Sequence, residues 1–431
     1  MAKENVYHSQ PDVERLEDYI PGGYHPTIIG DTFSNGRYTV IHKLGFGGYS
    51  TIWLARDQQH GRYVSLKILT ARASLESHEG EIITLLMNSD LYHTGKQFIP
   101  PLLGQFSFHG PNGYHSCLVG ELAGSTVAKS KEDSPNYMFP ADAARSIAAQ
   151  LILGLSYLHA KGICHGDLYL RNILLRTSNF DDLSIPKLYE RFGNPRKVTI
   201  RRVDGSPSQP HAPLHAIPPM GLYTPANELY DPEIIISDYG TSFLVAQTPS
   251  PTLYTPPLYS PPEDLFNEPI SHPTAADIWT LGVNLYDVLG ERPLFETLSW
   301  DRDEIFGEII DTLGKPPLRW WNSWLDRPQF SKEDGSRIDG FDSINPPAFR
   351  RLPRRLWDMG RGETEQTCEW DVAGGELRAL EDLLRAMMAF EPTERPTVDQ
   401  ILKSEYVVKW AMPAWERQKA RKRAHSTGEK D

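Results

Sequence analysis

The hydrophobic pattern of this chain changes once, near residues 121–124, and the change limits the folds that the chain can adopt. Before it, short alternating apolar runs predict strands, among them 38–44, 51–56, 63–69 and 117–119. One helical run interrupts them near 79–87. After the change, apolar residues recur at helical spacing, first from Ile147 to Leu158. The sequence therefore predicts an α+β protein of two lobes, β-rich at the N-terminus and α-helical towards the C-terminus.

These patterns divide the chain into an N-terminal extension (1–36), a strand-rich lobe (37–123), a helical lobe (124–411) and a basic tail (412–431). The helical lobe contains an insertion at about 177–233 that is rich in Pro, Gly and Ser. Such a composition does not favour regular structure. We expect the run 207–219 within it to be irregular and the tail to be mobile.

The composition is typical of a globular protein with an acidic surplus. Of the 431 residues, 39% are hydrophobic and 23% are charged, and the formal net charge is −12. This charge argues against direct nucleic-acid binding and leaves room for a basic partner. No apolar run is long enough to span a membrane, and residues 1–18 are too polar for a secretory signal. The three cysteines lack disulfide or metal-ligand spacing, which is typical of a reducing compartment. We expect a monomer of the cytoplasm and/or the nucleus.

A glycine-rich turn lies between the first two predicted strands. It reads Gly45-Phe46-Gly47-Gly48-Tyr49-Ser50; Leu44 ends the strand before it, and Ile52 lies on the next strand. Because the glycines carry no side chains, backbone N–H groups can approach phosphate oxygens there. An ordinary hairpin is the simpler interpretation of the turn alone. However, the next strand carries Lys67 and the following helix carries Glu81, so a carboxylate is available to aim a lysine at nucleotide phosphates.

A second pattern follows the long apolar helix and reads His165-Gly166-Asp167-Leu168-Tyr169-Leu170-Arg171-Asn172. The pattern places an aspartate five residues before an asparagine, so one loop carries a carboxylate that can accept a proton and an amide oxygen that can bind a metal ion. Further on, a run of isoleucines leads into Asp238-Tyr239-Gly240, a second candidate for metal binding. A lone Asp-Tyr-Gly is often only a turn. Here, however, it follows both this loop and a run of β-branched residues, so a chance occurrence of the three residues is a poor explanation.

Together these residues resemble the eukaryotic protein kinases, and the first part of the chain is similar to that of the SR-protein kinases. The similarity covers nearly the whole chain and includes a Pro-rich insertion ahead of Asp238. The segments that carry it are Asp18-Tyr19, Gly22-Gly23-Tyr24-His25-Pro26, Ile29-Gly30-Asp31, Gly36-Arg37-Tyr38, Lys43-Leu44-Gly45-Phe46-Gly47 and Tyr49-Ser50-Thr51-Ile52-Trp53-Leu54-Ala55-Arg56-Asp57. The resemblance implies the bilobal protein kinase fold.

The resemblance also implies transfer of the γ-phosphate of ATP to serine or threonine of proteins, with ATP and Mg²⁺ as cofactors. The implied substrates are basic, Arg/Ser-rich proteins. Asp167 would act as the catalytic base, and Asn172 and Asp238 would hold the metal. Lys67, paired with Glu81, would hold the ATP phosphates.

Two further groups of residues follow from the resemblance. One lines the ATP site and comprises Leu44, Gly45, Phe46, Gly47, Gly48, Tyr49, Ser50, Ile52, Lys67, Glu121 and Leu122. The other is scaffold: Glu263 would pair with Arg395, and the helix carrying Asp277 would brace the catalytic loop.

Two positions of this loop around Asp167 depart from the family pattern. Tyr169 stands where Ser/Thr kinases place a lysine that steadies the transferring phosphate, and Gly166 stands where many kinases have an arginine. We take Arg171 as the candidate for the missing positive charge. The departures leave two alternatives open, a pseudokinase-like nucleotide-binding scaffold and a small-molecule kinase. The catalytic residues that are present oppose the first, and the Glu263 and Arg395 landmarks oppose the second.

An arginine-rich substrate needs carboxylates close to the site of transfer. Glu304, Glu308 and Asp311 would share one face of a predicted helix, and Asp301 and Asp303 lie just ahead of it. This face is the candidate for binding substrate arginines. The alternative is an ordinary solvated helix face, which the spacing alone favours slightly.

Overall fold

The computed structural model describes residues 6–8, 10–177, 180–222, 224–249, 251–336, 338 and 350–428. The chain divides into two compact units. The strand-rich unit comprises Met1–Ser89, Pro100–Ser125 and Arg176–Tyr223. The helical unit comprises Asp90–Ile99, Thr126–Leu175 and Thr224–Asp431.

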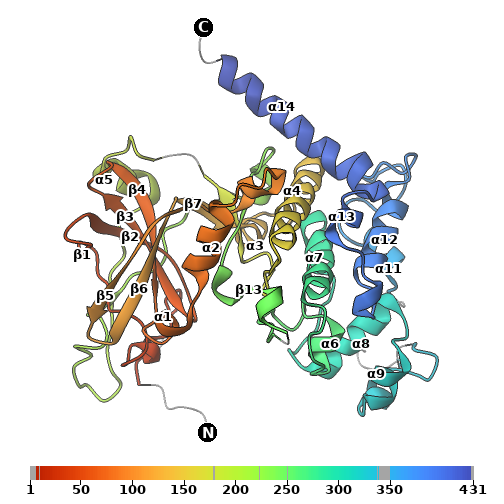
Figure 1. The fold of residues 1–431 in the computed structure, drawn as a ribbon, viewed down its shortest axis with the longest axis horizontal. Helices are drawn as coiled ribbons and strands as arrows, with labels where there is room; N and C mark the ends of the chain where they lie inside the picture. The colour runs from red at the N-terminus through yellow and green to blue at the C-terminus, as the bar shows by residue number, and fades with distance from the viewer. Residues whose placement is uncertain are drawn as a thin grey trace. The chain divides into compact units, whose positions relative to one another are not determined.

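The strand-rich unit is built on a six-stranded antiparallel sheet with the order β1-β2-β3-β4-β6-β5 (Figure 1). Its strands are β1 (Thr32–Phe33), β2 (Tyr38–Gly47), β3 (Ser50–Asp57), β4 (Arg62–Leu69), β5 (Leu102–Gly110) and β6 (Gly113–Gly120). Two helices, α1 (Ala73–Glu76) and α2 (Glu79–Met87), follow β4, and α2 packs against β5. A short strand, β7 (Ala123–Thr126), comes after β6. The strands and the helix predicted from the sequence pattern are therefore confirmed.

Both faces of this sheet are apolar because successive strand residues point to opposite sides. On one face, a core cluster includes Trp53, Leu66 and Val119. On the other face, Leu54 and Tyr63 belong to a second cluster. A sheet with two apolar faces needs a covering layer on each side.

The insertion supplies the cover for the second face. Phe180, Leu188 and Met220 pack against Leu54 and Tyr63. The insertion contains α5 (Ile185–Phe192) and a two-stranded ladder of β10 (Val198–Thr199) and β11 (His215–Ala216). The expectation that the run 207–219 is irregular is corrected at β11. The insertion belongs to the strand-rich unit although its sequence position places it in the helical lobe. Burial of its apolar side chains provides the driving force.

The helical unit is organised around α4 (Ala141–Ala160), which packs against α7 (Pro273–Leu289) and α14 (Met412–Gly428). The other helices are α3 (Val127–Glu132), α6 (Pro262–Leu265), α8 (Arg302–Leu313), α9 (Leu318–Ser323), α10 (Arg327–Phe330), α11 (Leu352–Trp357), α12 (Glu376–Met387) and α13 (Val398–Ile401). Two short antiparallel pairs complete it: β8 (Ile163–Cys164) with β13 (Phe243–Leu244), and β9 (Ile173–Arg176) with β12 (Ile234–Ile236). Within the part of the chain that the structure describes, no helix is long and apolar enough to cross a membrane.

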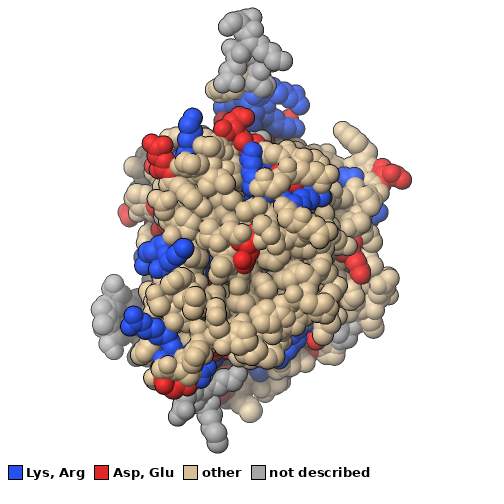
Figure 2. Space-filling model, turned by 90° about the vertical axis from the view of Figure 1, so that its left-hand side faces the viewer, with Lys and Arg blue, Asp and Glu red and all other residues tan. Residues whose placement is uncertain are grey.

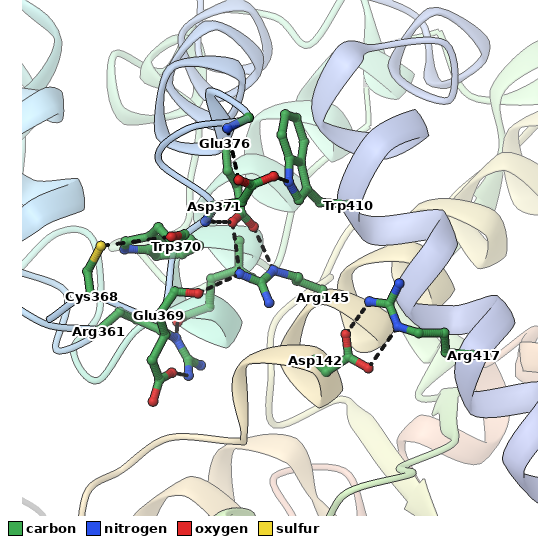
Figure 3. Close-up of polar contacts among 12 residues, drawn as sticks. Asp142, Arg145, Arg361, Cys368, Glu369, Trp370, Asp371, Glu376, Trp410 and Arg417 are labelled. Carbon is green, nitrogen blue, oxygen red and sulfur yellow. Dashed lines mark hydrogen bonds and ion pairs between the residues drawn. The ribbon is translucent and has the colours of Figure 1, made fainter. Parts of the chain in front are cut away.

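A polar network fixes the first residue of α12 to α4 (Figure 3). Arg145 donates from Nε and Nη2 to the two carboxylate oxygens of Glu376, at 2.6 and 2.8 Å. The Asp371 backbone N–H also donates to Glu376, at 2.7 Å, and Asp371 accepts a hydrogen bond from the Trp410 indole at 3.0 Å. Glu376 is fully buried, so this carboxylate depends on these partners for its charge to be tolerated.

The C-terminal segment is helical over its described length, and its mobility stays a prediction. Figure 1 shows the far end of α14 standing clear of the other helices of its unit. Nearer its start, Gln418 is buried and donates to the Pro232 carbonyl at 2.7 Å. Arg421 pairs with Asp231 at 2.6 Å, and Lys422 pairs with Glu233 at 2.9 Å. Acidic residues ahead of β12 thus neutralise part of the basic helix.

Candidate active site

The glycine-rich turn joins β2 and β3 within the strand-rich unit. Gly47 and Ser50 are its closing pair in the antiparallel register. An added Cβ at Gly45, Gly47 or Gly48 would meet no described atom within 4 Å. The Tyr49 side chain is exposed. The backbone of this turn therefore borders open space, as a segment that approaches phosphate groups requires.

Lys67 lies on β4 opposite Ile52 of β3, and its ammonium group is held by α2. Its Nζ lies 2.7 Å from each carboxylate oxygen of Glu79. The predicted pairing of Lys67 with Glu81 is wrong: Glu81 instead contacts His78 and its side chain is 79% exposed, against 5% for Glu79. The physical reason is the turn of the helix, which directs residue 79 towards the sheet and residue 81 towards solvent.

These two carboxylates provide a matched pair of variants. Glu79→Gln is expected to lower kcat/KM for ATP about tenfold or more, because Lys67 loses a charge-assisted bidentate contact. Glu81→Gln, two residues away on the same helix, is expected to change it by less than about twofold. Steady-state kinetics at varied ATP concentration would measure both. Equal losses for the two variants would contradict the assignment of Glu79.

Glu121 and Leu122, two of the residues predicted to line the ATP site, lie just beyond the end of β6. Ser65 of β4 is opposite Gly120, and its hydroxyl donates to the Glu121 carbonyl at 3.1 Å. The side chains of Leu44 and Leu122 are partly buried and pack against the apolar cluster that includes Leu54 and Met220. The Glu121 carbonyl therefore already accepts one hydrogen bond, and a ligand that donates to it would be its second donor.

In the helical unit, Asp167 and Asn172 are joined by hydrogen bonds within one loop. The Asn172 Nδ2 donates to the Asp167 carbonyl at 2.8 Å and to its Oδ2 at 2.9 Å. The Asp167 Oδ1 is buried and accepts no hydrogen bond from any described residue. Burial raises the pKa of Asp167 to about 7; Asn172 opposes the shift and Asp238 adds to it. This loop thus presents one carboxylate oxygen ready to accept a proton near neutral pH.

Asp238 adopts a left-handed backbone conformation, with φ 65° and ψ 69°. Such a conformation costs free energy in a residue other than glycine and is characteristic of functional sites. The preceding Ser237 anchors it, since its N–H and hydroxyl both bond to the Asn172 carbonyl, at 2.9 and 2.7 Å. Asp238 and Asn172 are thereby held by the same short connection.

The scaffold residues occupy the predicted positions. Asp277 accepts hydrogen bonds from the backbone N–H groups of His165, at 2.8 Å, and Gly166, at 3.1 Å. Glu263 and Arg395 form a buried bidentate pair with distances of 2.7 and 2.6 Å. The predicted bracing of the loop and the predicted ion pair are both confirmed.

Arg171 is engaged by α3. Its Nη2 lies 2.6 Å from the Glu132 Oε1, and both side chains are exposed. Tyr169 packs against Tyr259, with 5.9 Å between ring centroids. The role of Arg171 in place of the missing lysine stays a prediction. In that role the guanidinium would contact the transferring phosphate while it also pairs with Glu132.

Two acidic residues of α8 are buried in the protein interior. The Glu308 and Asp311 residues are only 8% and 5% exposed, and Glu308 pairs with Arg355 at 2.7 Å. Glu304 accepts from the Ser299 N–H, and Asp303 accepts from the Trp324 indole. Both interpretations of this helix, a binding face and a solvated face, are therefore wrong for Glu308 and Asp311.

No three side chains of His, Cys, Asp or Glu gather into a metal-binding group in the described ranges. A Mg²⁺ ion rarely requires such a group, because it commonly takes one or two carboxylates and completes its shell with phosphate oxygens and water. Asp238 and Asn172 fit that donor set.

Comparison with protein families assigns the class. The protein kinase domain matches residues 38–196 and 224–407, and the unmatched stretch between them falls within the insertion. The chain belongs to the protein kinase domain family. This domain implies the use of ATP and of a divalent metal ion.

The curated relatives point to one branch of that family. The chain is 39% identical over 166 residues to protein kinase dsk1 of Schizosaccharomyces pombe, covering 38% of this chain and 30% of the relative. It is 40% identical over 166 residues to SRSF protein kinase 3 of Homo sapiens, covering 38% and 29%. It is 27% identical over 413 residues to the serine/threonine-protein kinase SRPK of Physarum polycephalum, covering 91% of each. The chain thus has SR-protein kinase relatives, although it spans less than a third of the length of the first two.

A solved structure supports the fold. The crystal structure of the PF14_0431 kinase domain matches with a TM-score of 0.58 and 17% identity, covering 89% of this chain and 98% of that one. At this identity the match concerns the fold alone. The predicted fold class is confirmed: a protein kinase fold with a strand-rich part and a helical part.

Proposed function

We propose that this protein transfers the γ-phosphoryl group of ATP to serine, or threonine, hydroxyls of proteins. The observation that carries the proposal is the environment of Asp167. Its Oδ2 is fixed by Asn172, whereas its Oδ1 is buried and accepts no hydrogen bond from the described residues. A buried acceptor without a donor is costly unless a ligand supplies one. A substrate hydroxyl is such a donor.

The proposed role of Asp167 is to orient this hydroxyl and to accept its proton at Oδ1 as the oxygen attacks phosphorus. A pKa of about 7 leaves a large ionised fraction at neutral pH. Asn172 restrains the carboxylate through Oδ2, so that Oδ1 keeps one orientation. Asp277 holds the loop backbone and thereby limits its movement during the reaction.

The strand-rich unit supplies the nucleotide contacts in this proposal. Lys67, aimed by Glu79, would bind the phosphates, and the backbone of Gly45–Ser50 would border them. Mg²⁺, held by Asp238 and Asn172, would neutralise charge on the transferring group. These assignments follow from the donor types and from the contacts within each unit.

The proposed substrates are basic Arg/Ser-rich proteins, bound by a monomer acting in the cytoplasm and/or the nucleus. The relative named SRSF protein kinase 3 supports this substrate class. The net charge of −12 suits a basic partner, although α8 does not offer Glu308 or Asp311 to it. Recognition of arginine would have to use other carboxylates.

The test compares three substrates with labelled ATP and Mg²⁺: an Arg-Ser repeat peptide, a Lys-Ser repeat peptide of equal length, and a generic basic protein. Lysine keeps the charge but lacks the bidentate geometry of arginine. We expect the highest kcat/KM for the Arg-Ser peptide, by about tenfold over Lys-Ser. Equal rates would remove arginine specificity and keep the kinase. Labelling of no protein substrate would contradict the proposal itself.

A further inference from the structure

The strand-rich unit contains a buried ion pair between its N-terminal segment and its sheet. The face seen in Figure 2 shows basic and acidic side chains scattered among uncharged ones. Below the surface, Lys43 of β2 pairs with Glu14 of the N-terminal segment, and their side chains are 0% and 1% exposed. Tyr19 donates a hydrogen bond to the same carboxylate. A buried charge is tolerated only when a partner of opposite charge neutralises it. Separation of the N-terminal segment from β2 would leave Lys43 without this partner, so the ion pair holds the segment against the strand.

This ion pair lies next to the glycine-rich turn. Lys43 precedes the turn by two residues, and its Nζ is 5.3 Å from the ring centroids of both Phe46 and Trp53. Phe46 is part of the turn itself. The cation therefore joins the N-terminal segment, the sheet and one residue of the turn in a single contact group.

A second contact from the N-terminal segment reaches the turn directly. The Tyr24 hydroxyl donates to the Gly47 carbonyl at 2.8 Å. The glycines of this turn border open space, because a Cβ added at Gly45, Gly47 or Gly48 would meet no described atom within 4 Å. A segment with little packing above it depends on such hydrogen bonds for its conformation.

Backbone contacts hold Tyr24 in place. The carbonyls of Gly22 and Gly23 accept from the N–H groups of Arg72 and Ala71, at 2.8 and 3.0 Å. A Cβ at residue 23 would lie 1.8 Å from the Asp18 carbonyl oxygen, so this position admits only glycine. The approach of the N-terminal segment to the sheet is thus defined by the chain itself.

The insertion secures the same segment from outside. The Val203 N–H donates to the Val6 carbonyl at 2.9 Å, and the His8 N–H donates to the Arg201 carbonyl at 3.1 Å. Side chains from both segments form one buried cluster, which comprises Tyr7, Leu16, Tyr19, Tyr24, Ile200, Ala212 and Ala216. Asn112, in the β5–β6 turn, donates to the carbonyls of both Tyr24 and His211.

We propose that residues 6–8 and 10–25, secured by the insertion, form a clamp that holds the glycine-rich turn in the conformation that binds nucleotide phosphates. Tyr24 is a positioning residue that acts through the Gly47 carbonyl, and Glu14 is one that acts through Lys43. This inference rests on the proposed function, since it specifies how the same nucleotide site is shaped. It gives the N-terminal segment and the insertion a common role.

The test uses two tyrosines that each donate one hydroxyl hydrogen bond to a β2 carbonyl. Tyr24 reaches Gly47 in the turn, and Tyr189 of the insertion reaches Ile41 at 2.9 Å, away from it. Tyr24→Phe and Tyr189→Phe keep their rings and therefore their packing. Calorimetry would give dissociation constants for adenosine and for a non-hydrolysable ATP analogue with Mg²⁺, and thermal melting would check the fold.

Tyr24→Phe is expected to weaken binding of the ATP analogue about fivefold, the effect of one hydrogen bond, and to leave adenosine binding unchanged. Tyr189→Phe is expected to change neither. Unchanged analogue binding by Tyr24→Phe, or equal losses in both variants, would overturn the clamp while leaving the proposed function intact. Failure of the unmodified protein to bind the analogue would overturn both.

Discussion

Asp167→Asn is expected to lower kcat for phosphoryl transfer by about a thousandfold, the middle of the range for a lost general base. Asparagine has the same shape and can still accept a hydrogen bond from Asn172, so the loop is retained. It cannot take a proton from the substrate. Binding of a non-hydrolysable ATP analogue, measured by calorimetry, is expected to stay within about threefold of the unmodified protein.

Stability provides an independent readout for the same variant. Burial raises the pKa of Asp167 to about 7 in the folded protein, above its value in the unfolded chain. The ionised carboxylate therefore costs stability as pH rises through about 7, whereas the protonated form does not. Asp167→Asn should be near neutral in its effect on the free energy of unfolding around pH 4 and stabilising, on the order of 2–4 kcal/mol, above pH 8. A loss of stability at every pH would show that the carboxylate is structural and would contradict its catalytic role.

Glu376→Ala is expected to cost about 3–5 kcal/mol in the free energy of unfolding, the typical effect of removing one partner from a buried ion pair. Arg145 would remain largely enclosed with two of its donors unpaired, and the Asp371 N–H would lose its acceptor (Figure 3). Urea unfolding followed by tryptophan fluorescence would measure the loss.

The same close-up contains the matched control. Asp142, three residues before Arg145 on α4, pairs with Arg417, but both side chains are substantially exposed. Asp142→Ala is expected to cost less than about 1 kcal/mol. Similar losses for the two variants would mean that burial does not set the strength of these pairs, and would contradict the account of the network.

The sequence contained more information about the partner of Lys67 than the prediction used. Glu79, Ile82, Ile83 and Leu86 recur at helical spacing and are all buried. Glu81 is two positions from Glu79, which turns it about 200° around the helix axis. Family order alone identified a helical acid after the lysine, whereas the helical face selects Glu79. The two-residue error thus came from a signal that was present.

The burial of the α8 carboxylates could not be predicted from the local sequence. The spacing of Glu304, Glu308 and Asp311 correctly places them near one another on a helix. What buries Glu308 is Arg355, which lies 47 residues further along the chain. A contact of that separation depends on tertiary packing, and spacing cannot reveal it. The catalytic loop was easier to predict because Asp167 and Asn172 are bonded within five residues.

The insertion combines both situations. Ile185, Leu188, Tyr189 and Phe192 have the spacing of an amphipathic helix and indicate α5, although the surrounding chain is rich in Pro and Gly. That this helix covers Leu54 and Tyr63 is a long-range contact, so the sequence could not show to which part of the molecule the insertion belongs.

The discontinuity of the strand-rich unit bears on how the protein is made. A ribosome releases the strands β2–β4 first, then residues 126–175 of the other unit, and only afterwards Leu188 and Met220. During that interval the sheet face around Leu54 and Tyr63 has no permanent cover. Exposed apolar sheet surface favours association between unfinished chains. Until Met220 has been synthesised, nascent chains of this kinase therefore expose this apolar sheet face, which is a surface that a chaperone could bind.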